Sequence, residues 1–348
     1  MTSRLTVDLE ALGDNFRILS QYTRCGAVLK ADAYGMGAVQ VGRHLQGLGC
    51  DDFFVASVAE GIPLRRCLTN SARIHVFAGA VESTVDALRE HDLRPILNTV
   101  DQLDAWRVGG EGRHCSVHVD TGMARLGLPW REIEGVDFHG LFVESVLTHM
   151  ACADEPGHAF NAVQLDRFAA ILPHFPQASI SLGNSPAILS GFHDRFDRPH
   201  LGRPGIALYG GNPFSKQANP MRAVARVEAR ILQVRRLAAG ESVGYGGTYV
   251  TPTDADIATL GIGYADGIPR ALSNVGCVAE AGRRFPIVGR VSMDLLQADI
   301  TGSGLREGDW LEVFGREITL DEMAVSAGSI SYEILTRVGP RMERIYRA

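Results

Sequence analysis

The chain has 348 residues, of which 45% are hydrophobic and 21% are charged, and its formal net charge is −6. This apolar content supports a full core and excludes a disordered or fibrous protein, and the acidic balance argues against a nucleic-acid or membrane-surface binder, which needs a basic face. No apolar run is long enough to span a bilayer, the N-terminus lacks the apolar stretch of a signal peptide, and the six cysteines show no Cys-x-x-Cys spacing. We therefore expect a cytoplasmic protein with reduced, mostly buried thiols.

The first 215 residues alternate short apolar runs with segments of helical spacing. The apolar runs predict strands at 27–30, 52–56, 73–78, 93–97, 115–119, 141–148, 178–182 and 206–209. Helical spacing predicts helices at 39–48, 81–89, 99–108 and 159–172. Strands that alternate with helices imply parallel βα units, and eight such units favour a (β/α)8 barrel. The alternative is a doubly wound open sheet, but no Gly-x-Gly-x-x-Gly follows the first strand.

After about residue 222 the pattern becomes all-β, with glycine and aspartate turns between the runs. These runs are 224–237, 243–250, 257–262, 276–281, 285–300 and 310–314, followed by helical pieces at 320–327 and 330–337 and a last strand at 342–346. We predict an α/β chain of two domains, a barrel over residues 1–222 and a mainly antiparallel β domain over residues 223–348.

Lysine is almost absent, because only Lys30 and Lys216 stand among 34 basic side chains. Lysine, unlike arginine, can lose its proton and act as a nucleophile or base. Lys216 lies in a polar segment that is typical of an exposed loop, whereas Lys30 ends an apolar run. The alternative for Lys30 is a surface lysine whose stem packs on apolar neighbours.

Polar or glycine-rich clusters follow five of the predicted barrel strands, at 30–35, 120–125, 148–149, 183–185 and 203–205. Each alone could be a turn, a helix cap or a core histidine. Together they lie at the end of the barrel where functional residues gather, and the loops after strands seven and eight often bind phosphate there. A lysine at a strand end beside a phosphate site favours pyridoxal 5′-phosphate held as a Schiff base.

Residues 27–37, AVLKADAYGMG, resemble the cofactor-lysine signature of bacterial alanine racemases. The resemblance continues in the same order along the chain, through 119–127, 147–151, 184–185, 203–209, 243–249, 261–267, 289–294 and 331–333. It implies a pyridoxal-phosphate enzyme that acts as a homodimer with shared active sites. The implied reaction interconverts L-alanine and D-alanine through an external aldimine, and its implied role is to supply D-alanine for peptidoglycan.

The resemblance also implies the roles of individual residues. Lys30 would carry the cofactor and act as one base, and Tyr245 of the partner chain would be the opposite base. Arg125 would hold the substrate carboxylate. Arg203 would face the pyridine nitrogen, and His149 would link Arg203 to Tyr245.

Further residues are implied around the cofactor and the substrate. The cofactor-binding set includes Tyr34, Asn184, Ser185, Gly205, Ile206 and Tyr332. Met293 and Asp294 would come from the partner subunit and lie beside the substrate. Tyr264 would line the entry channel. No metal is expected, because no histidine or cysteine cluster has ligand spacing.

Elementary chemistry agrees with this assignment. Racemisation removes the Cα proton on one face and returns a proton on the other, so two acid–base groups on opposite faces suit it. Lysine and tyrosine have ordinary pKa values of about 10.4 and 10, and nearby arginine cations favour the deprotonated form of each. An arginine at the ring nitrogen cannot lend it a proton, which should weaken the electron sink and restrain side reactions.

Two positions depart from the family pattern. Met36 stands where family members commonly have histidine, and His118 stands where some carry a modified lysine near the substrate arginine. That modification cannot occur on histidine, so another group must orient Arg125.

Three other readings stay open at this stage. The first is a different enzyme on the same scaffold: a broad-specificity or serine/lysine racemase, or a barrel-type decarboxylase. The second is a non-enzymatic, single-domain cofactor-binding barrel, against which the β domain carrying Tyr245 and Met293 argues. The third is a cofactor-independent racemase with a cysteine pair, but no cysteine lies in an electropositive polar loop.

Overall fold

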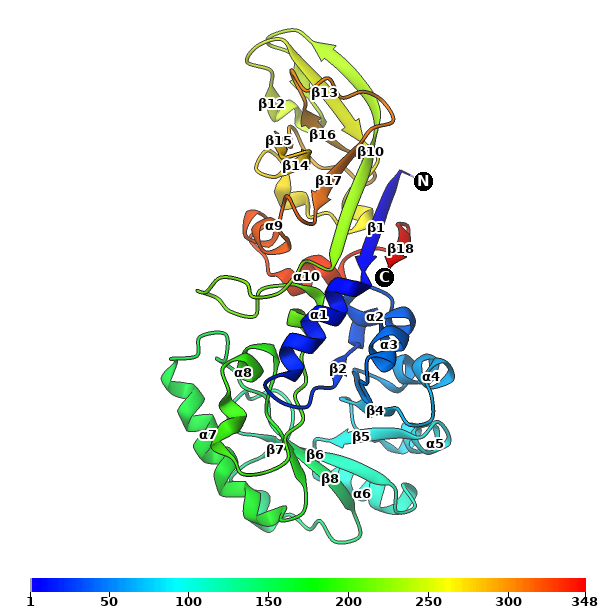
Figure 1. The fold of residues 1–348 in the computed structure, drawn as a ribbon, viewed down its shortest axis with the longest axis vertical. Helices are drawn as coiled ribbons and strands as arrows, with labels where there is room; N and C mark the ends of the chain where they lie inside the picture. Colours follow the sequence, from blue (N-terminus) through cyan, green and yellow to red (C-terminus); the bar gives the residue numbers. More distant parts are fainter. Residues whose placement is uncertain (1) are drawn as a thin grey trace.

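The computed structural model describes residues 2–348, and Figure 1 shows a barrel below a mainly antiparallel β structure. Seven parallel strands are hydrogen-bonded in the order β2-β3-β4-β5-β6-β8-β9. They are β2 (Ala27–Val28), β3 (Asp52–Val55), β4 (Arg73–Val76), β5 (Leu93–Leu97), β6 (His114–Asp120), β8 (Phe142–Leu147) and β9 (Ser179–Ser181). The strands are largely buried, as expected when helices cover a parallel sheet. The predicted fold class is confirmed.

The barrel closes through residues 199–204, which form no regular strand. The Leu201 N–H donates to the Ile180 carbonyl at 2.9 Å, and the Gly26 N–H donates to the Gly202 carbonyl at 2.9 Å. The predicted eighth strand at 206–209 is wrong, because this segment is the 3-10 helix η4 (Ile206–Tyr209). A short apolar run that is buried on all sides is compatible with a strand or with a helix, because its hydrophobic periodicity does not distinguish the two.

Helices surround the parallel strands, with α3 to α6 on one side of the barrel in Figure 1. The helices of this part are α1 (Leu9–Ser20), α2 (Lys30–Tyr34), α3 (Ala38–Gly47), α4 (Val58–Cys67), α5 (Glu82–Glu90), α6 (Val100–Gly109), α7 (Ala159–Ile171) and α8 (Ser185–Leu189). Side-chain caps begin several of these helices: Ser57, Thr99 and Asn184, for example, each accept a hydrogen bond from a backbone N–H in the first turn.

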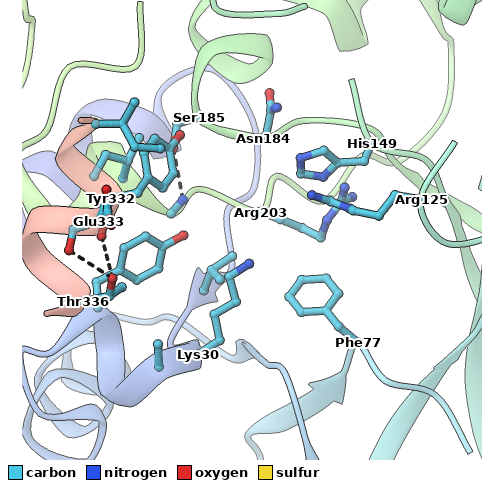
Figure 2. Close-up of a pocket in the computed structure, with 16 residues that line it drawn as sticks. Lys30, Phe77, Arg125, His149, Asn184, Ser185, Arg203, Tyr332, Glu333 and Thr336 are labelled. Carbon is cyan, nitrogen blue, oxygen red and sulfur yellow. Dashed lines mark hydrogen bonds between the residues drawn. The ribbon is translucent and has the colours of Figure 1, made fainter. Parts of the chain in front are cut away.

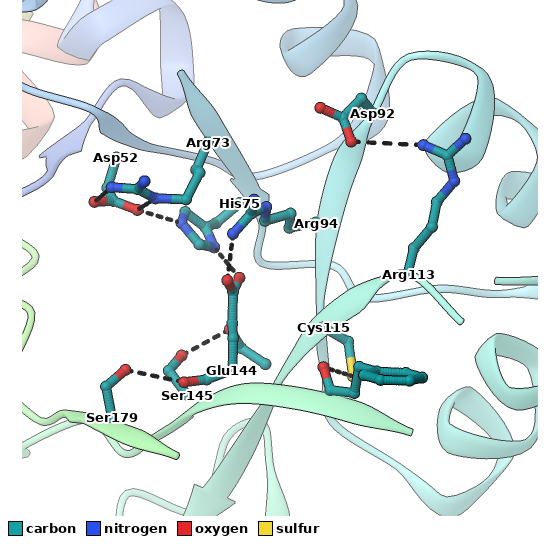
Figure 3. Close-up of polar contacts among 12 residues, drawn as sticks. Asp52, Arg73, His75, Asp92, Arg94, Arg113, Cys115, Glu144, Ser145 and Ser179 are labelled. Atoms are coloured by element: carbon teal, nitrogen blue, oxygen red, sulfur yellow. Dashed lines mark hydrogen bonds and ion pairs between the residues drawn. The ribbon is translucent and has the colours of Figure 1, made fainter. Parts of the chain in front are cut away.

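A buried ionic network joins the strands near the N-terminal end of the barrel (Figure 3). Arg73 donates from Nε and Nη2 to the Asp52 carboxylate at 2.7 Å, and His75 Nε2 lies 3.0 Å from the same group. Burial alone would raise the pKa of Asp52, but these hydrogen bonds and charges hold it well below its usual range. Arg94 on β5 forms an ion pair with Glu144 on β8. Residues at this end of a barrel serve stability.

The second part of the chain forms an eight-stranded sheet that also contains the first strand. Its strands are β1 (Ser3–Asp8), β10 (Ala225–Leu237), β13 (Ala255–Leu260), β14 (Cys277–Glu280), β15 (Arg283–Pro286), β16 (Leu296–Asp299), β17 (Trp310–Phe314) and β18 (Glu343–Arg347). Strand β1 pairs antiparallel with β10 and parallel with β18. The proposed boundary at residue 222 divides the chain into two consecutive segments. The sheet of the second segment, however, also contains β1 from the N-terminus.

Short elements complete this part. The hairpin β11 (Ser242–Val243) and β12 (Tyr249–Val250) carries the turn η5 (Tyr245–Gly247), and α9 (Leu320–Ser326) and α10 (Ser331–Thr336) lead back toward the barrel. Over residues 2–348, no helix is both long and apolar enough to cross a bilayer.

Candidate active site

A cavity of about 540 Å³ opens where the parallel strands end (Figure 2). It brings together predicted residues from loops far apart in sequence: Lys30, Tyr34, Arg125, His149, Asn184, Ser185, Arg203, Gly205, Ile206 and Tyr332. Further lining residues that the sequence argument missed are Val28, Ala31, Phe77, Ile330, Glu333 and Thr336. The cavity is therefore formed by the barrel mouth and by helix α10.

Lys30 begins a turn of left-handed helix. Ala31, Asp32 and Ala33 have φ of 53–54° and ψ of 47–51°, a conformation that costs about 1–2 kcal/mol per non-glycine residue. The Ala38 N–H donates to Asp32 Oδ1 at 2.7 Å, and the Ala31 N–H donates to Glu60 Oε1 at 2.9 Å. Side-chain carboxylates thus hold a strained backbone at the residue that the sequence singled out.

The surroundings of Lys30 favour its neutral amine. Burial and then the charge of Arg125 lower the pKa of Lys30, and Glu60 opposes them. The ammonium nitrogen lies 5.8 Å from the centre of the Phe77 ring. A lysine with a lowered pKa is suited to act as a nucleophile or base.

Arg203 is a buried cation, with 4% of its surface exposed. Nη1 donates to the Ser181 carbonyl at 2.6 Å and Nη2 to the Thr148 carbonyl at 2.7 Å. Burial lowers the pKa of Arg203 to about 10, which leaves it charged at neutral pH. Nη1 also donates to the Ser181 hydroxyl. No carboxylate of residues 2–348 forms an ion pair with Arg203, so its charge is balanced by the dipoles of these carbonyl and hydroxyl groups.

His149 lines the cavity with Arg203. Burial, followed by the charges of Arg203 and Arg125, lowers the pKa of His149 well below its usual value. The imidazole is therefore neutral, with one nitrogen that can accept a hydrogen bond.

A group of hydroxyls and backbone N–H groups forms one wall of the cavity. Ser185 Oγ accepts from the N–H groups of Gly205 and Ala207 at 3.0 and 3.3 Å. A Cβ at Gly205 would lie 2.2 Å from the Tyr34 hydroxyl, so only glycine fits there. Burial raises the pKa of Tyr34 and raises that of Tyr332 to about 12. Both phenols stay protonated and can donate to an anion.

The loop that carries Arg125 is held by one carboxylate. Asp120 accepts from the N–H groups of Gly122 and Met123 at 2.8 Å and from that of Ala124 at 2.9 Å. The Arg125 guanidinium itself has no hydrogen-bonding or ionic partner in the part of the chain that the structure describes, so it is free to bind an anion. Asp120 precedes Arg125 on this loop and is a candidate for the group that orients its side chain.

Four predicted residues lie outside the cavity. Tyr245, Met293 and Tyr264 are exposed, at 71%, 53% and 44%, and Asp294 pairs with Arg341 at 2.8 Å. Tyr245 directly follows β11, whose partner strand β12 lies in the β structure far from the barrel in Figure 1. In a single protomer, these four residues therefore contribute nothing to the cavity, whose acid–base groups come from the barrel mouth and from Tyr332 and Glu333 of α10.

Signals for the missed residues differ. Phe77 directly follows strand β4, so the strand-end rule could have found it. Glu60 and Asp120 act through backbone N–H groups whose positions depend on the folded chain, and their spacing in the sequence resembles ordinary helix and turn caps.

Two family models match the chain. The model described as alanine racemase, N-terminal domain, matches residues 7–213, and the one described as alanine racemase, C-terminal domain, matches residues 224–346. An alanine racemase of Rhodospirillum rubrum is 44% identical over 99% of this chain and 96% of its own length. Biosynthetic and catabolic alanine racemases of Agrobacterium fabrum are 41% and 40% identical over 99% of this chain and 93% and 92% of their own lengths.

Solved structures agree with these matches. The crystal structure of alanine racemase from Bartonella henselae, described with covalently bound pyridoxal phosphate, superposes with a TM-score of 0.93 at 35% identity over the full length of both chains. The biosynthetic alanine racemase from Pseudomonas aeruginosa superposes with a TM-score of 0.91 at 32% identity, over 100% of this chain and 99% of its own.

Proposed function

The chain belongs to the alanine racemase family of isomerases, and on that premise we propose that it interconverts L-alanine and D-alanine with pyridoxal 5′-phosphate. The observation that carries the proposal is the convergence of Lys30, Arg125 and Arg203 with a hydroxyl-lined wall in one cavity. These groups match an aldehyde, a substrate carboxylate, a pyridine nitrogen and a phosphate.

The residues present fit this cofactor. Lys30 would bind its aldehyde carbon, and Arg203 would lie at its ring nitrogen. Ser185, the glycine at 205 and the protonated phenols of Tyr34 and Tyr332 would surround its phosphate, together with Asn184 and Ile206. When bound, pyridoxal phosphate supplies the electron sink that makes the Cα proton of an amino acid acidic.

The chain's own residues then position the substrate and move its proton. The partner-free guanidinium of Arg125 would bind the substrate carboxylate. Lys30, as a neutral amine, would take or return the Cα proton on its own face of the substrate. Since Arg203 keeps its proton at neutral pH, it would not protonate the ring nitrogen, which favours simple proton return over side reactions.

The second base is proposed to be Tyr245 of the partner chain, in a homodimer with shared active sites. Inversion at Cα needs a proton carrier on the face opposite Lys30, and we assign that role to a residue from outside the protomer's own cavity. Tyr245 is highly exposed for an aromatic side chain and stands in a glycine turn, where Gly244 has φ +71°. The neutral His149 would link Arg203 to this tyrosine, and Met293, Asp294 and Tyr264 would complete the partner's side of the site.

The decisive experiment is racemisation by the purified protein over a panel of L-amino acids with added pyridoxal phosphate. We expect L-alanine to be the preferred substrate, with D-alanine as product. Equal rates for serine, lysine and other amino acids would instead identify a broad-specificity racemase, and no racemisation at all would refute the proposal.

We further propose that the product D-alanine serves peptidoglycan synthesis. The chain is 41% identical to a relative named as biosynthetic and 40% identical to one named as catabolic. Because these two identities do not separate the two roles, the test is genetic. Deletion of the gene should make growth depend on added D-alanine. Growth without D-alanine, but not on D-alanine as the carbon source, would assign the catabolic role.

A further inference from the structure

We propose that Glu60 is a positioning residue for Lys30, because its carboxylate accepts a hydrogen bond from the strained turn that directly follows Lys30 and ties this turn to the end of the neighbouring strand. The inference relies on the proposed function only for the role of Lys30. Nothing in the sequence argument singled out this glutamate.

The position of Glu60 in the chain predicts a different contact. Ser57 caps helix α4 and Glu60 is its third residue, which is the Ser-x-x-Glu spacing of a capping box. In that motif, the glutamate carboxylate returns to the N–H of the cap residue. Here Glu60 Oε2 accepts instead from the Ala56 N–H at 2.7 Å, and Oε1 accepts from the Ala31 N–H at 2.9 Å.

This contact joins two neighbouring strand ends. Ala56 directly follows β3, and Ala31 is the residue after Lys30 in the left-handed turn that follows β2. A hydrogen bond to a charged acceptor is stronger than one to a neutral acceptor, and the left-handed conformation is unfavourable at each non-glycine residue. Glu60 therefore offsets part of the strain that fixes the backbone of Lys30.

The charge of Glu60 also acts on the lysine. Several charged and titratable groups surround Lys30. They are Tyr34 from α2, Glu60 from α4, Arg125 from the loop after β6, His149 after β8, Arg203 from the closing segment, and Glu333 and Tyr332 from α10. Burial and Arg125 lower the pKa of Lys30, and Glu60 raises it. Neutralising Glu60 should therefore lower the pKa of Lys30 further.

The two-lysine composition of the chain allows a direct test. Cofactor-free protein is labelled briefly with acetic anhydride across a pH series, and the acetylated fractions of Lys30 and Lys216 are measured by mass spectrometry. We expect E60Q to shift the Lys30 labelling curve to lower pH, while Lys216, paired with Glu155 on the surface, keeps its curve. E82Q, the same change in the first turn of helix α5, is the matched control and should shift neither curve.

Cofactor affinity gives a second readout, by fluorescence titration with pyridoxal phosphate. E60A loses both backbone contacts and should bind the cofactor about tenfold or more weakly, the loss expected for one charged hydrogen bond. The aspartate of E60D keeps the charge but is one methylene shorter. This variant should bind pyridoxal phosphate more weakly than the wild type, while its Lys30 labelling curve should stay near that of the wild type.

E60A removes most of the side chain and could fail to fold. E60Q keeps the side-chain volume, so the test does not depend on whether E60A folds. An unchanged Lys30 labelling curve together with unchanged cofactor affinity in E60Q would overturn the inference, even if its melting temperature dropped. Failure of the wild-type protein to bind pyridoxal phosphate would instead refute the proposed function, and the labelling curves would still decide the role of Glu60.

Discussion

His118 and Asn98 face each other inside the barrel, with Nδ1 of the imidazole 2.9 Å from Oδ1 of the amide. The Asn98 amide nitrogen donates to the carbonyls of Phe77 and Ile96, which fixes its oxygen toward the histidine. His118 therefore carries its proton on Nδ1. Burial and then the charge of Arg203 lower the pKa of His118 to about 3, so this side chain is neutral at neutral pH.

The first prediction is that His118 makes the protein sensitive to acid. Its folded-state pKa lies below the unfolded value of about 6.5, so between pH 6.5 and 3 the unfolded state binds one more proton at this position. Stability should therefore fall as the pH drops through this window, by about 1.4 kcal/mol per pH unit for this group. Denaturant unfolding from pH 7 to 4.5 should show a shallower pH slope in His118→Asn.

The matched control is His174→Asn, the same change at an exposed position. Burial lowers the pKa of His149 and His200 as well, so the total slope exceeds that of one proton. An identical slope in wild type and His118→Asn would contradict the prediction.

The second prediction concerns Asp120, which holds the loop before Arg125. Asp120→Asn keeps one oxygen acceptor but turns an NH2 group toward a backbone N–H, so at least one charged hydrogen bond is lost. We expect the KM for alanine to rise about tenfold, with a smaller change in kcat, because the substrate arginine is displaced and Lys30 is not. Steady-state racemisation kinetics measure both.

Asp137→Asn serves as the control, since Asp137 makes a similar contact to the His139 N–H on an exposed turn. If Asp120→Asn lowered kcat and left KM unchanged, the loop would not act by orienting Arg125.

The third prediction is that the purified protein is yellow and that borohydride attaches the reduced cofactor to Lys30. Lys30 reaches into the cavity with a lowered pKa, whereas Lys216 is 75% exposed at its side chain and paired with Glu155. Peptide mapping after reduction locates the label. Lys216→Ala should keep the visible band and Lys30→Ala should lose it; a label on Lys216 would refute the mechanism.

The fourth prediction is that two inactive variants restore activity in a mixed dimer. Lys30→Ala and Tyr245→Phe each remove one base from both sites of a homodimer. If each site takes Lys30 from one chain and Tyr245 from the other, a mixed dimer has one site with both bases and one with neither. Random subunit exchange makes about half the dimers mixed, so activity should recover to about a quarter of wild type.

Exchange itself is verified with mass-tagged chains in native mass spectrometry. Should exchange occur without any return of activity, both bases would come from the same chain and the shared-site proposal would be wrong.

The strands were predictable where a short apolar run lay between turn residues, as in β5 and β17, whose bounds match the sequence expectation. The segment 199–204 was not predictable, because it contains two prolines and a histidine and joins the barrel through isolated long-range hydrogen bonds. Strand β1 was missed for a similar reason. Its partners lie more than 200 residues away, and no local pattern records such a pairing.

Within the candidate site, the residues that carry chemistry were accessible to sequence reasoning and the residues that hold them were not. Lys30 stood out because lysine is rare in this chain and because it ends a strand. Glu60 and Asp120 act on backbone N–H groups, which every residue except proline possesses. Their importance depends on the left-handed turn at residues 31–34 and on the loop at 122–124, and these conformations are seen only in the folded chain.

The position of β1 between β10 and β18 sets the order in which the molecule can be completed during synthesis. Residues Ser3–Asp8 precede both strands that flank them by more than 200 residues, because β10 and β18 lie after residue 224. During synthesis the barrel segment is therefore made while β1 still has both edges unpaired. Without Glu343–Arg347, β1 becomes an edge strand of the sheet, so a chain that stalls or is cut before these residues exposes unpaired backbone groups at Ser3–Asp8.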